Sequence, residues 1–292
     1  MKVIVTGAGG LVGGSLSRRL ARGRTVLALG RADLDVTDAA AARRLILSER
    51  PALVANCAVL GVDECERDPT AARAVNVDAP RALAAACAEA GAEFLHFSTN
   101  YVFDGRRGVP YAEDDEPSPL NVYGRTKAEG ERAALGAGPR CYVVRTSWVF
   151  GAGKNSFLST AHRELRAGRS VRAIKDSWAS VTYVEDLSRR VEEIIGRAGY
   201  GLSHVVNGGV CTQEDFAREA ARLVGLRGEE GALLVEAVPE SEMRRAAPRP
   251  RFTPMRSLAE GRLGLTPLRG WREALADYVA GDLEEAHGAT DA

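Results

Sequence analysis

The stretch Val3-Ile4-Val5-Thr6-Gly7-Ala8-Gly9-Gly10-Leu11-Val12-Gly13 carries an apolar run straight into a group of glycines. The β-branched run predicts a buried strand over residues 3–6, and the pattern that follows predicts a helix over residues 11–22. Gly7, Gly10 and Gly13 fall at the spacing G-x-x-G-x-x-G. A strand, a glycine turn and a helix in this order predict a phosphate-binding loop.

Each of the three glycines has a physical role in this loop. Gly7 permits the tight turn out of the strand, Gly10 lets the backbone approach a pyrophosphate, and Gly13 lets the helix pack closely on the sheet. The helix N-terminus offers unpaired N–H groups to the anion. We therefore expect dinucleotide binding by a set of five residues: Gly7, Gly10, Leu11, Val12 and Gly13.

Strand and helix patterns alternate along the next part of the chain. Strands are predicted at residues 25–29, 53–57, 93–98 and 141–146, and helices at 39–48, 79–90 and 121–135. This alternation predicts an α/β fold of the Rossmann type, a doubly wound parallel sheet with helices on both faces.

The alternation loosens after residue 150. Helices are predicted at residues 157–166, 184–195, 216–224 and 271–283, and strands at 171–174, 205–207 and 233–235. We expect residues 1–150 to form an NAD(P)-binding domain that carries the catalytic residues. Residues 151–292 are expected to complete the sheet and to form a small C-terminal substrate-binding lobe.

The end of the second predicted strand bears on the choice of cofactor. It reads Leu29-Gly30-Arg31, without the acid that usually bonds the ribose hydroxyls of NAD. Arg31 is either a forked cation for a 2′-phosphate or a solvated loop residue. Asp35 and Val36 suit an adenine, although Asp35 equally suits a turn before Thr37. These residues favour NADPH, with NADH as the alternative.

A tyrosine and a lysine, Tyr123 and Lys127, stand four residues apart on a predicted helix and so share one face. An ammonium group stabilises a phenolate, so the pair predicts proton transfer to a carbonyl. Ser98 and Thr99 follow the fourth strand at its carboxyl end, where such sheets bind ligands. Their hydroxyls are candidates to hold the carbonyl, although a hydroxyl at a strand end also caps its own backbone.

Bulk composition excludes several classes of function. The 292 residues hold 39 Lys and Arg against 39 Asp and Glu, which argues against broad capture of nucleic acid or membrane. Five cysteines without a C-x-x-C pair predict free thiols in the cytoplasm. The four histidines show no metal-ligand spacing, so no metal is expected. The acidic run at residues 113–116 is predicted to be a solvated turn.

Four ordered blocks of the sequence resemble the dTDP-4-dehydrorhamnose reductase family of extended short-chain dehydrogenases/reductases. They are the glycine loop, Ser98 to Gly105, Pro119 to Lys127, and Arg145 to Phe150. The resemblance implies a catalytic trio of Thr99, Tyr123 and Lys127. It also implies hydride transfer to C4 of a nucleotide-linked, dTDP-type 4-keto-6-deoxy-hexose.

The resemblance also assigns contacts around the two ligands. It places Cys57, Ala58 and Ser98 beside the cofactor and Trp148 against the sugar, where the alternative for Trp148 is a core aromatic. Asn100 stands where the family has an acid that faces the sugar hydroxyls. Arg249 is a candidate for a substrate phosphate, in competition with three other arginines of the same proline-rich region: Arg244, Arg245 and Arg251.

Two other functions remain open at this point. One is a reductase or epimerase that acts on a UDP- or GDP-sugar. The other is a non-catalytic dinucleotide-binding regulatory subunit that resembles the one of methionine adenosyltransferase. A homodimer is compatible with each of them.

Overall fold

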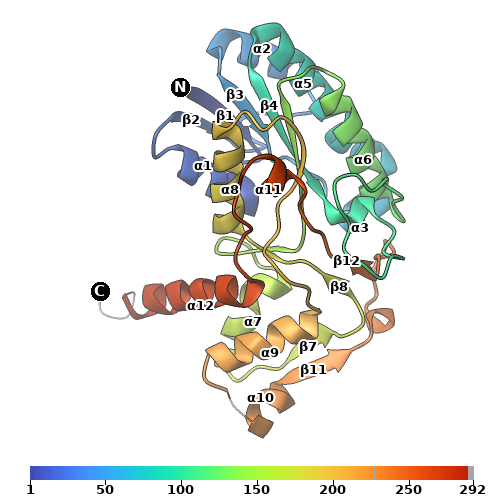
Figure 1. Ribbon diagram of the computed structural model, residues 1–292, viewed down its shortest axis with the longest axis vertical. Helices are drawn as coiled ribbons and strands as arrows, with labels where there is room; N and C mark the ends of the chain where they lie inside the picture. The colour runs from blue at the N-terminus through green and yellow to red at the C-terminus, as the bar shows by residue number, and fades with distance from the viewer. Residues whose placement is uncertain (227, 289–292) are drawn as a thin grey trace.

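The computed structural model describes residues 1–226 and 228–288. Its centre is a six-stranded sheet in the order β10-β5-β4-β3-β1-β2, in which every neighbouring pair is parallel (Figure 1). The strands are β1 (Lys2–Thr6), β2 (Thr25–Leu29), β3 (Leu53–Asn56), β4 (Glu93–Thr99), β5 (Cys141–Thr146) and β10 (Gly201–His204). Within the sheet, β2 lies beside β1 on one side and β3 lies beside β1 on the other, so the strand order reverses at β1. The loop after β1 therefore lies at the switch point where open α/β sheets bind ligands.

Helices cover both faces of the sheet, as the sequence predicted. Helices α1 (Leu11–Leu20) and α8 (Val184–Gly196) pack together, whereas α2 (Ala39–Glu49), α5 (Ala79–Ala90) and α6 (Val122–Leu135) form a second layer. The strand residues divide between two apolar clusters with period two. Val3 and Val5 join Leu16 of α1, while Ile4 between them joins Ile46 of α2. Burial on both faces explains why the strands are almost continuously apolar.

Part of the chain beyond residue 150 gathers around a separate apolar cluster that contains Phe150, Leu165, Phe216 and Trp271, whereas α8 packs into the cluster of the sheet. Its elements lie together in the lower part of Figure 1 and include α7 (Phe157–Arg166), β7 (Val171–Ile174), α9 (Gln213–Leu223), α10 (Gly228–Leu234), β11 (Val235–Val238) and α12 (Trp271–Gly288). The shorter elements are β6 (Val149–Phe150), β8 (Trp178–Ala179), β9 (Thr182–Tyr183), β12 (Phe252–Thr253) and α11 (Ala259–Arg262). Within the described residues, no helix combines the length and the apolar character needed to cross a bilayer.

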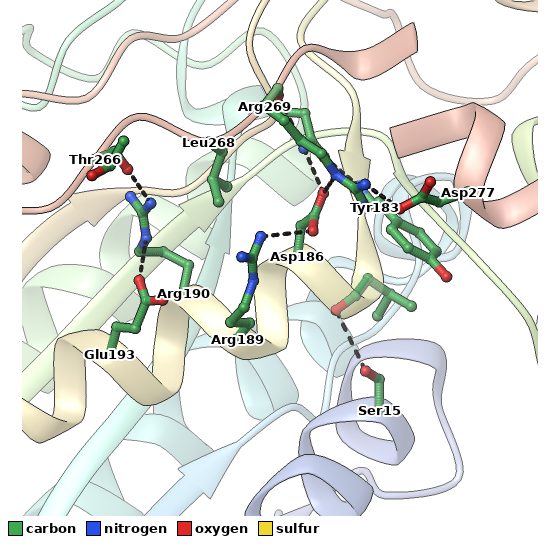
Figure 2. A network of polar contacts seen from close by, with 12 residues as sticks. Ser15, Tyr183, Asp186, Arg189, Arg190, Glu193, Thr266, Leu268, Arg269 and Asp277 are labelled. Carbon is green, nitrogen blue, oxygen red and sulfur yellow. Dashed lines mark hydrogen bonds and ion pairs between the residues drawn. The ribbon is translucent and has the colours of Figure 1, made fainter. Parts of the chain in front are cut away.

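Helix α8 joins the sheet layer to the C-terminal segment (Figure 2). The Asp186 carboxylate accepts hydrogen bonds from Asn207 and Arg269, each at 2.8 Å, and from Arg189 at 2.9 Å. One turn further on, Arg190 donates to the backbone carbonyl of Thr266. Asp186 is only 4% exposed, so its charge is matched by these donors rather than by water.

Candidate active site

The glycine loop turns tightly at the end of β1. Gly7 has a φ of +66°, and a Cβ on Gly13 would lie 2.3 Å from the Gly7 carbonyl oxygen, so α1 begins in direct contact with the turn. Gly10 is the N-cap of α1 and provides no side-chain cap. The first N–H groups of α1, at Leu11 and Val12, lie at the wall of a cavity. Such a helix start suits an anion.

One cavity, of about 330 Å³, lies between the loop and the end of β2. Arg31 is exposed where it lines this cavity, and Val36 is buried there. The Asp35 carboxylate accepts the backbone N–H of Thr37 at 2.9 Å and its hydroxyl at 2.7 Å, and these hydrogen bonds lower the pKa of Asp35. Asp35 is therefore a turn residue that also lines the cavity.

A second cavity, of about 430 Å³, shares lining residues with the first, among them Gly10, Cys57 and Ala58. The two cavities therefore form one cleft across the carboxyl edge of the sheet. Most of the residues that the sequence nominated line this second part: Gly10, Leu11, Val12, Gly13, Cys57, Ala58, Ser98, Thr99, Asn100, Tyr123, Lys127 and Trp148. Burial raises the pKa of the Cys57 thiol to about 12, which makes it a packing group rather than a nucleophile.

Tyr123 and Thr99 meet inside this cleft. Asn121 caps α6 by accepting the N–H of Gly124 at 2.8 Å, which fixes the start of the helix that carries Tyr123. Burial raises the pKa of Tyr123 to about 12, and a hydrogen bond with Thr99 opposes the rise. The Thr99 hydroxyl also accepts the backbone N–H of Tyr101 at 3.2 Å. It thus acts both as a strand-end cap and as a neighbour of the phenol.

Lys127 lines the cleft one turn after Tyr123 on α6, and its side chain is almost fully buried. Its Nζ donates to the backbone carbonyl of Phe97 at 2.5 Å and lies 3.1 Å from Nε2 of His96. Burial lowers the pKa of Lys127 to about 8.

Asn100 and Trp148, which the sequence nominated as sugar contacts, line the same cleft. Asn100 is 2% exposed and donates to the Thr253 hydroxyl at 2.7 Å, so its amide connects β4 to the C-terminal segment. Trp148 has a φ of +39°, an uncommon conformation for a residue with a side chain, and it lines the cleft while it packs against the second apolar cluster. Trp148 is therefore both a core-edge aromatic and a cleft residue.

Arg249 does not line the cleft. Its guanidinium donates to the Asp63 carboxylate at 2.7 Å and to the Ala247 carbonyl at 2.8 Å, and it lies 6.0 Å from the centre of the Tyr101 ring. The role of Arg249 toward a substrate phosphate stays a prediction. Its partner Asp63 lies on α3 (Val62–Arg67), a helix that the sequence did not predict.

Lys154 and Ser147 are among the cleft residues that the sequence did not indicate. Lys154 is exposed, lines the same cavity as the glycine loop, and follows Gly151 and Gly153, whose φ values are +149° and +95°. The signal in the sequence was a lysine between glycines and an amphipathic helix. Ser147 is 2% exposed, and its hydroxyl has no hydrogen-bond partner among the residues described.

These features fit a dinucleotide. The loop provides a cradle that side chains would fill, since a Cβ on Gly7 would lie 2.7 Å from the Ala58 nitrogen. Ser98 and Ser147 each present a buried hydroxyl that lacks a partner within the described chain, and both line the cleft. A ligand with polar groups and an anionic centre matches this lining.

Comparisons with known proteins agree with this geometry. The family model described as the RmlD substrate binding domain matches residues 1–283. The chain is 42% identical over 284 residues to a dTDP-4-dehydrorhamnose reductase of Mycolicibacterium smegmatis, covering 96% of this chain and 85% of that protein. It is 36% identical to a dTDP-4-keto-6-deoxy-D-glucose reductase of Streptomyces niveus, covering 93% of this chain and 94% of that protein.

A solved structure gives the same picture. The crystal structure of a dTDP-4-dehydrorhamnose reductase from Bacillus anthracis in complex with NADP superposes with a TM-score of 0.90 at 29% identity, covering 96% of this chain and 99% of that chain. The fold and the cleft therefore define an extended short-chain dehydrogenase/reductase of the Rossmann type. Within that class, the chain belongs to the RmlD substrate binding domain family.

Proposed function

We propose that this chain is an NADPH-dependent reductase of the C4 keto group of a dTDP-linked 4-keto-6-deoxy-hexose. The observation that carries the proposal is that Thr99, Tyr123 and Lys127 line the same cleft as the glycine loop. The names of the two relatives, both reductases of dTDP-sugars, support it. A non-catalytic regulatory subunit would need the loop alone and would leave this trio without a use.

Proton transfer is assigned to Tyr123. When bound, NADPH supplies the hydride that reaches the carbonyl carbon, and the Tyr123 hydroxyl donates its proton to the carbonyl oxygen. Thr99, which hydrogen-bonds to Tyr123, also holds that oxygen. The Lys127 ammonium group then stabilises the negative charge that this proton transfer leaves on the Tyr123 oxygen, because a nearby positive charge favours a phenolate.

The cofactor is assigned to the connected cavities. Gly7, Gly10 and Gly13, with Leu11 and Val12, hold its pyrophosphate at the start of α1. Arg31 is exposed at the end of β2, where a guanidinium meets a 2′-phosphate, which favours NADPH over NADH. Asp35, Val36, Cys57, Ala58 and Ser98 complete the contacts. Lys154 adds an exposed cation beside the glycine loop.

The sugar is assigned to the part of the cleft that Asn100 and Trp148 line, after the ends of β4 and β5. Arg249 is assigned to a substrate phosphate, from the loop that Asp63 holds in place. Residues 1–150 then serve as the cofactor domain that carries the catalytic residues. Residues 151–292 complete the sheet through β10 and form the substrate lobe, and the separate apolar cluster beyond residue 150 supports this lobe.

Two further assignments accompany this proposal. All five cysteines are free thiols, which supports action in the reducing cytoplasm. A homodimer is compatible with the proposed reaction and stays a prediction, to be measured by sedimentation of the purified chain.

The decisive experiment is a substrate panel. Purified protein is mixed with dTDP-, UDP- and GDP-linked 4-keto-sugars and with NADPH or NADH, and the absorbance of the reduced nicotinamide is followed. We expect loss of absorbance with NADPH and a dTDP-sugar, and a Y123F variant slower by orders of magnitude at unchanged NADPH affinity. Full activity of Y123F, or turnover confined to UDP- or GDP-sugars, would refute the proposal.

A further inference from the structure

A chain of buried hydrogen bonds runs beneath the cleft from β1 to Lys127. Thr6 donates its hydroxyl to Oδ1 of Asn56 at 2.8 Å, Nδ2 of Asn56 lies 3.2 Å from Nδ1 of His96, and Nε2 of His96 lies 3.1 Å from Nζ of Lys127. These four residues are each no more than 2% exposed. Each polar atom in the chain must therefore find its partner within the protein.

The backbone fixes the direction of these hydrogen bonds. The N–H of Ala58, which can only donate, points to Oδ1 of Asn56 at 3.2 Å, so that atom must be the carbonyl oxygen. The amide nitrogen of Asn56 then faces His96, and it too can only donate. Nδ1 of His96 must accept, and the single proton of a neutral imidazole lies on Nε2. His96 is neutral, since burial lowers its pKa well below 6.5.

The Nε2–H of His96 therefore points at Nζ of Lys127. Only the neutral amine of Lys127 has a lone pair that can accept this hydrogen bond. The ammonium form would place its own N–H donors against the N–H donor of His96. In the other tautomer of His96 the proton lies on Nδ1 and faces the amide N–H donor of Asn56, so two donors oppose each other there instead. We propose, on the basis of the reductase function above, that Asn56 and His96 are positioning residues that stabilise Lys127 as an amine and so promote transfer of its proton to Tyr123.

The proton step balances. Tyr123 gives its proton to the substrate carbonyl oxygen, and a proton from Lys127 replaces it: the Nζ–H bond breaks and the Oη–H bond forms. The lone pair left on Nζ accepts the Nε2–H of His96, and water later returns a proton to the amine. No electrons are exchanged in this step, and His96 keeps its own proton throughout.

Other ionisable groups near Lys127 also affect its protonation, but they do not reverse the preference of His96 for the neutral amine. Glu131 lies one turn along α6 and favours the ammonium, but it is held by two hydrogen bonds from Arg145 at 2.8 and 2.7 Å. Cys65 of α3 and Cys57 after β3 face Lys127 as thiols, because burial raises the pKa of both. Tyr123 lies one turn before Lys127 on the same helix.

The protonation of Lys127 is directly measurable, because the sequence has only four lysines, at positions 2, 127, 154 and 175. Full-length protein with ¹³C at the lysine ε carbon is titrated by NMR, and a K127R variant assigns the signal. The first comparison is a double-mutant cycle of N56D in the wild type and on the H96F background. A carboxylate at position 56 accepts the proton of Nδ1 and turns Nε2 into an acceptor for the ammonium.

We expect N56D to raise the titration midpoint of Lys127 by about one pH unit more in the wild type than on the H96F background. The new carboxylate also acts on Lys127 through space, but this effect is the same in the wild type and in H96F, so it cancels when the two shifts are compared. Equal shifts would overturn the proposal. If the cycle does not fold, H96Q decides it: its free amide turns its oxygen to the ammonium and raises the midpoint above about 8, whereas an unchanged or lower midpoint is the overturning result.

The readout is independent of the reductase assignment. If no keto-sugar is turned over while the Lys127 midpoint follows these variants, the reductase function fails and the hydrogen-bond chain stands. If turnover is found but the midpoint does not move, the function stands and Asn56 and His96 are ordinary core residues.

Discussion

Arg145 of β5 and Glu131 of α6 form a two-pronged ion pair inside the protein, with side chains that are 3% and 5% exposed. E131Q leaves the guanidinium buried beside a neutral amide, and we expect a loss of about 3–5 kcal/mol in the free energy of unfolding. Urea denaturation measures it. The matched control is E89Q, which removes the exposed partner of Arg43 and should change the midpoint little. Equal losses in the two variants would contradict the argument.

The contact between Gly7 and Gly13 makes the loop intolerant of a side chain. G13A places a methyl group against a backbone carbonyl that cannot move without distorting the turn. We expect a loss of about 1–3 kcal/mol in stability and a marked drop in NADPH affinity. G23A is the control, because a Cβ there meets no atom within 4 Å. Thermal unfolding and NADPH fluorescence report the two effects, and a G13A variant with wild-type affinity would refute the assigned role of the loop.

Much of the fold was predictable because the strong local signals agree with the final packing. Strands over residues 25–29, 141–146 and 171–174 and the helix over residues 157–166 lie where the sequence placed them. Others failed for identifiable reasons. The chain from Pro69 to Asp78 is already helical and continues into α5, but its five-residue pieces are too short to show a period. The sixth strand is 201–204 rather than 205–207, because pairing with β5 sets its register.

The same distinction applies to the site: its local sequence motifs could be predicted, and its contacts between distant segments could not. The glycine loop and the pair Tyr123 and Lys127 are local motifs, and they line one cleft. Contacts between remote segments carried no local signal. Asp63 meets Arg249 across 186 positions. Glu113, expected in a solvated turn, has a side chain that is only 10% exposed and accepts the backbone N–H groups of His204 and Leu258.

The Asp63–Arg249 pair ties α3 to the loop beside Tyr101. Asp63 also accepts the N–H of Ala247 at 3.0 Å, so D63A frees the loop at two points. We expect the KM for the keto-sugar to rise about tenfold, with the NADPH dissociation constant unchanged. E242Q is the control, because Glu242 pairs with Arg172 at an exposed position. A D63A variant with lower KM would instead mean that Asp63 competes with the substrate for Arg249.

Lys154 is an exposed cation of the cleft, as is Arg31, and the pyrophosphate that Lys154 contacts belongs either to the cofactor or to the dTDP-sugar. Because the glycine loop lines the same cavity, we expect K154Q to weaken NADPH binding about tenfold, whereas K154R keeps most of the affinity. Titrations with NADPH and with dTDP separate the two ligands: a loss for dTDP alone assigns Lys154 to the substrate. K175Q, at an exposed position outside the cleft, is the control for the loss of one positive charge. Unchanged affinity for both ligands would remove Lys154 from the site.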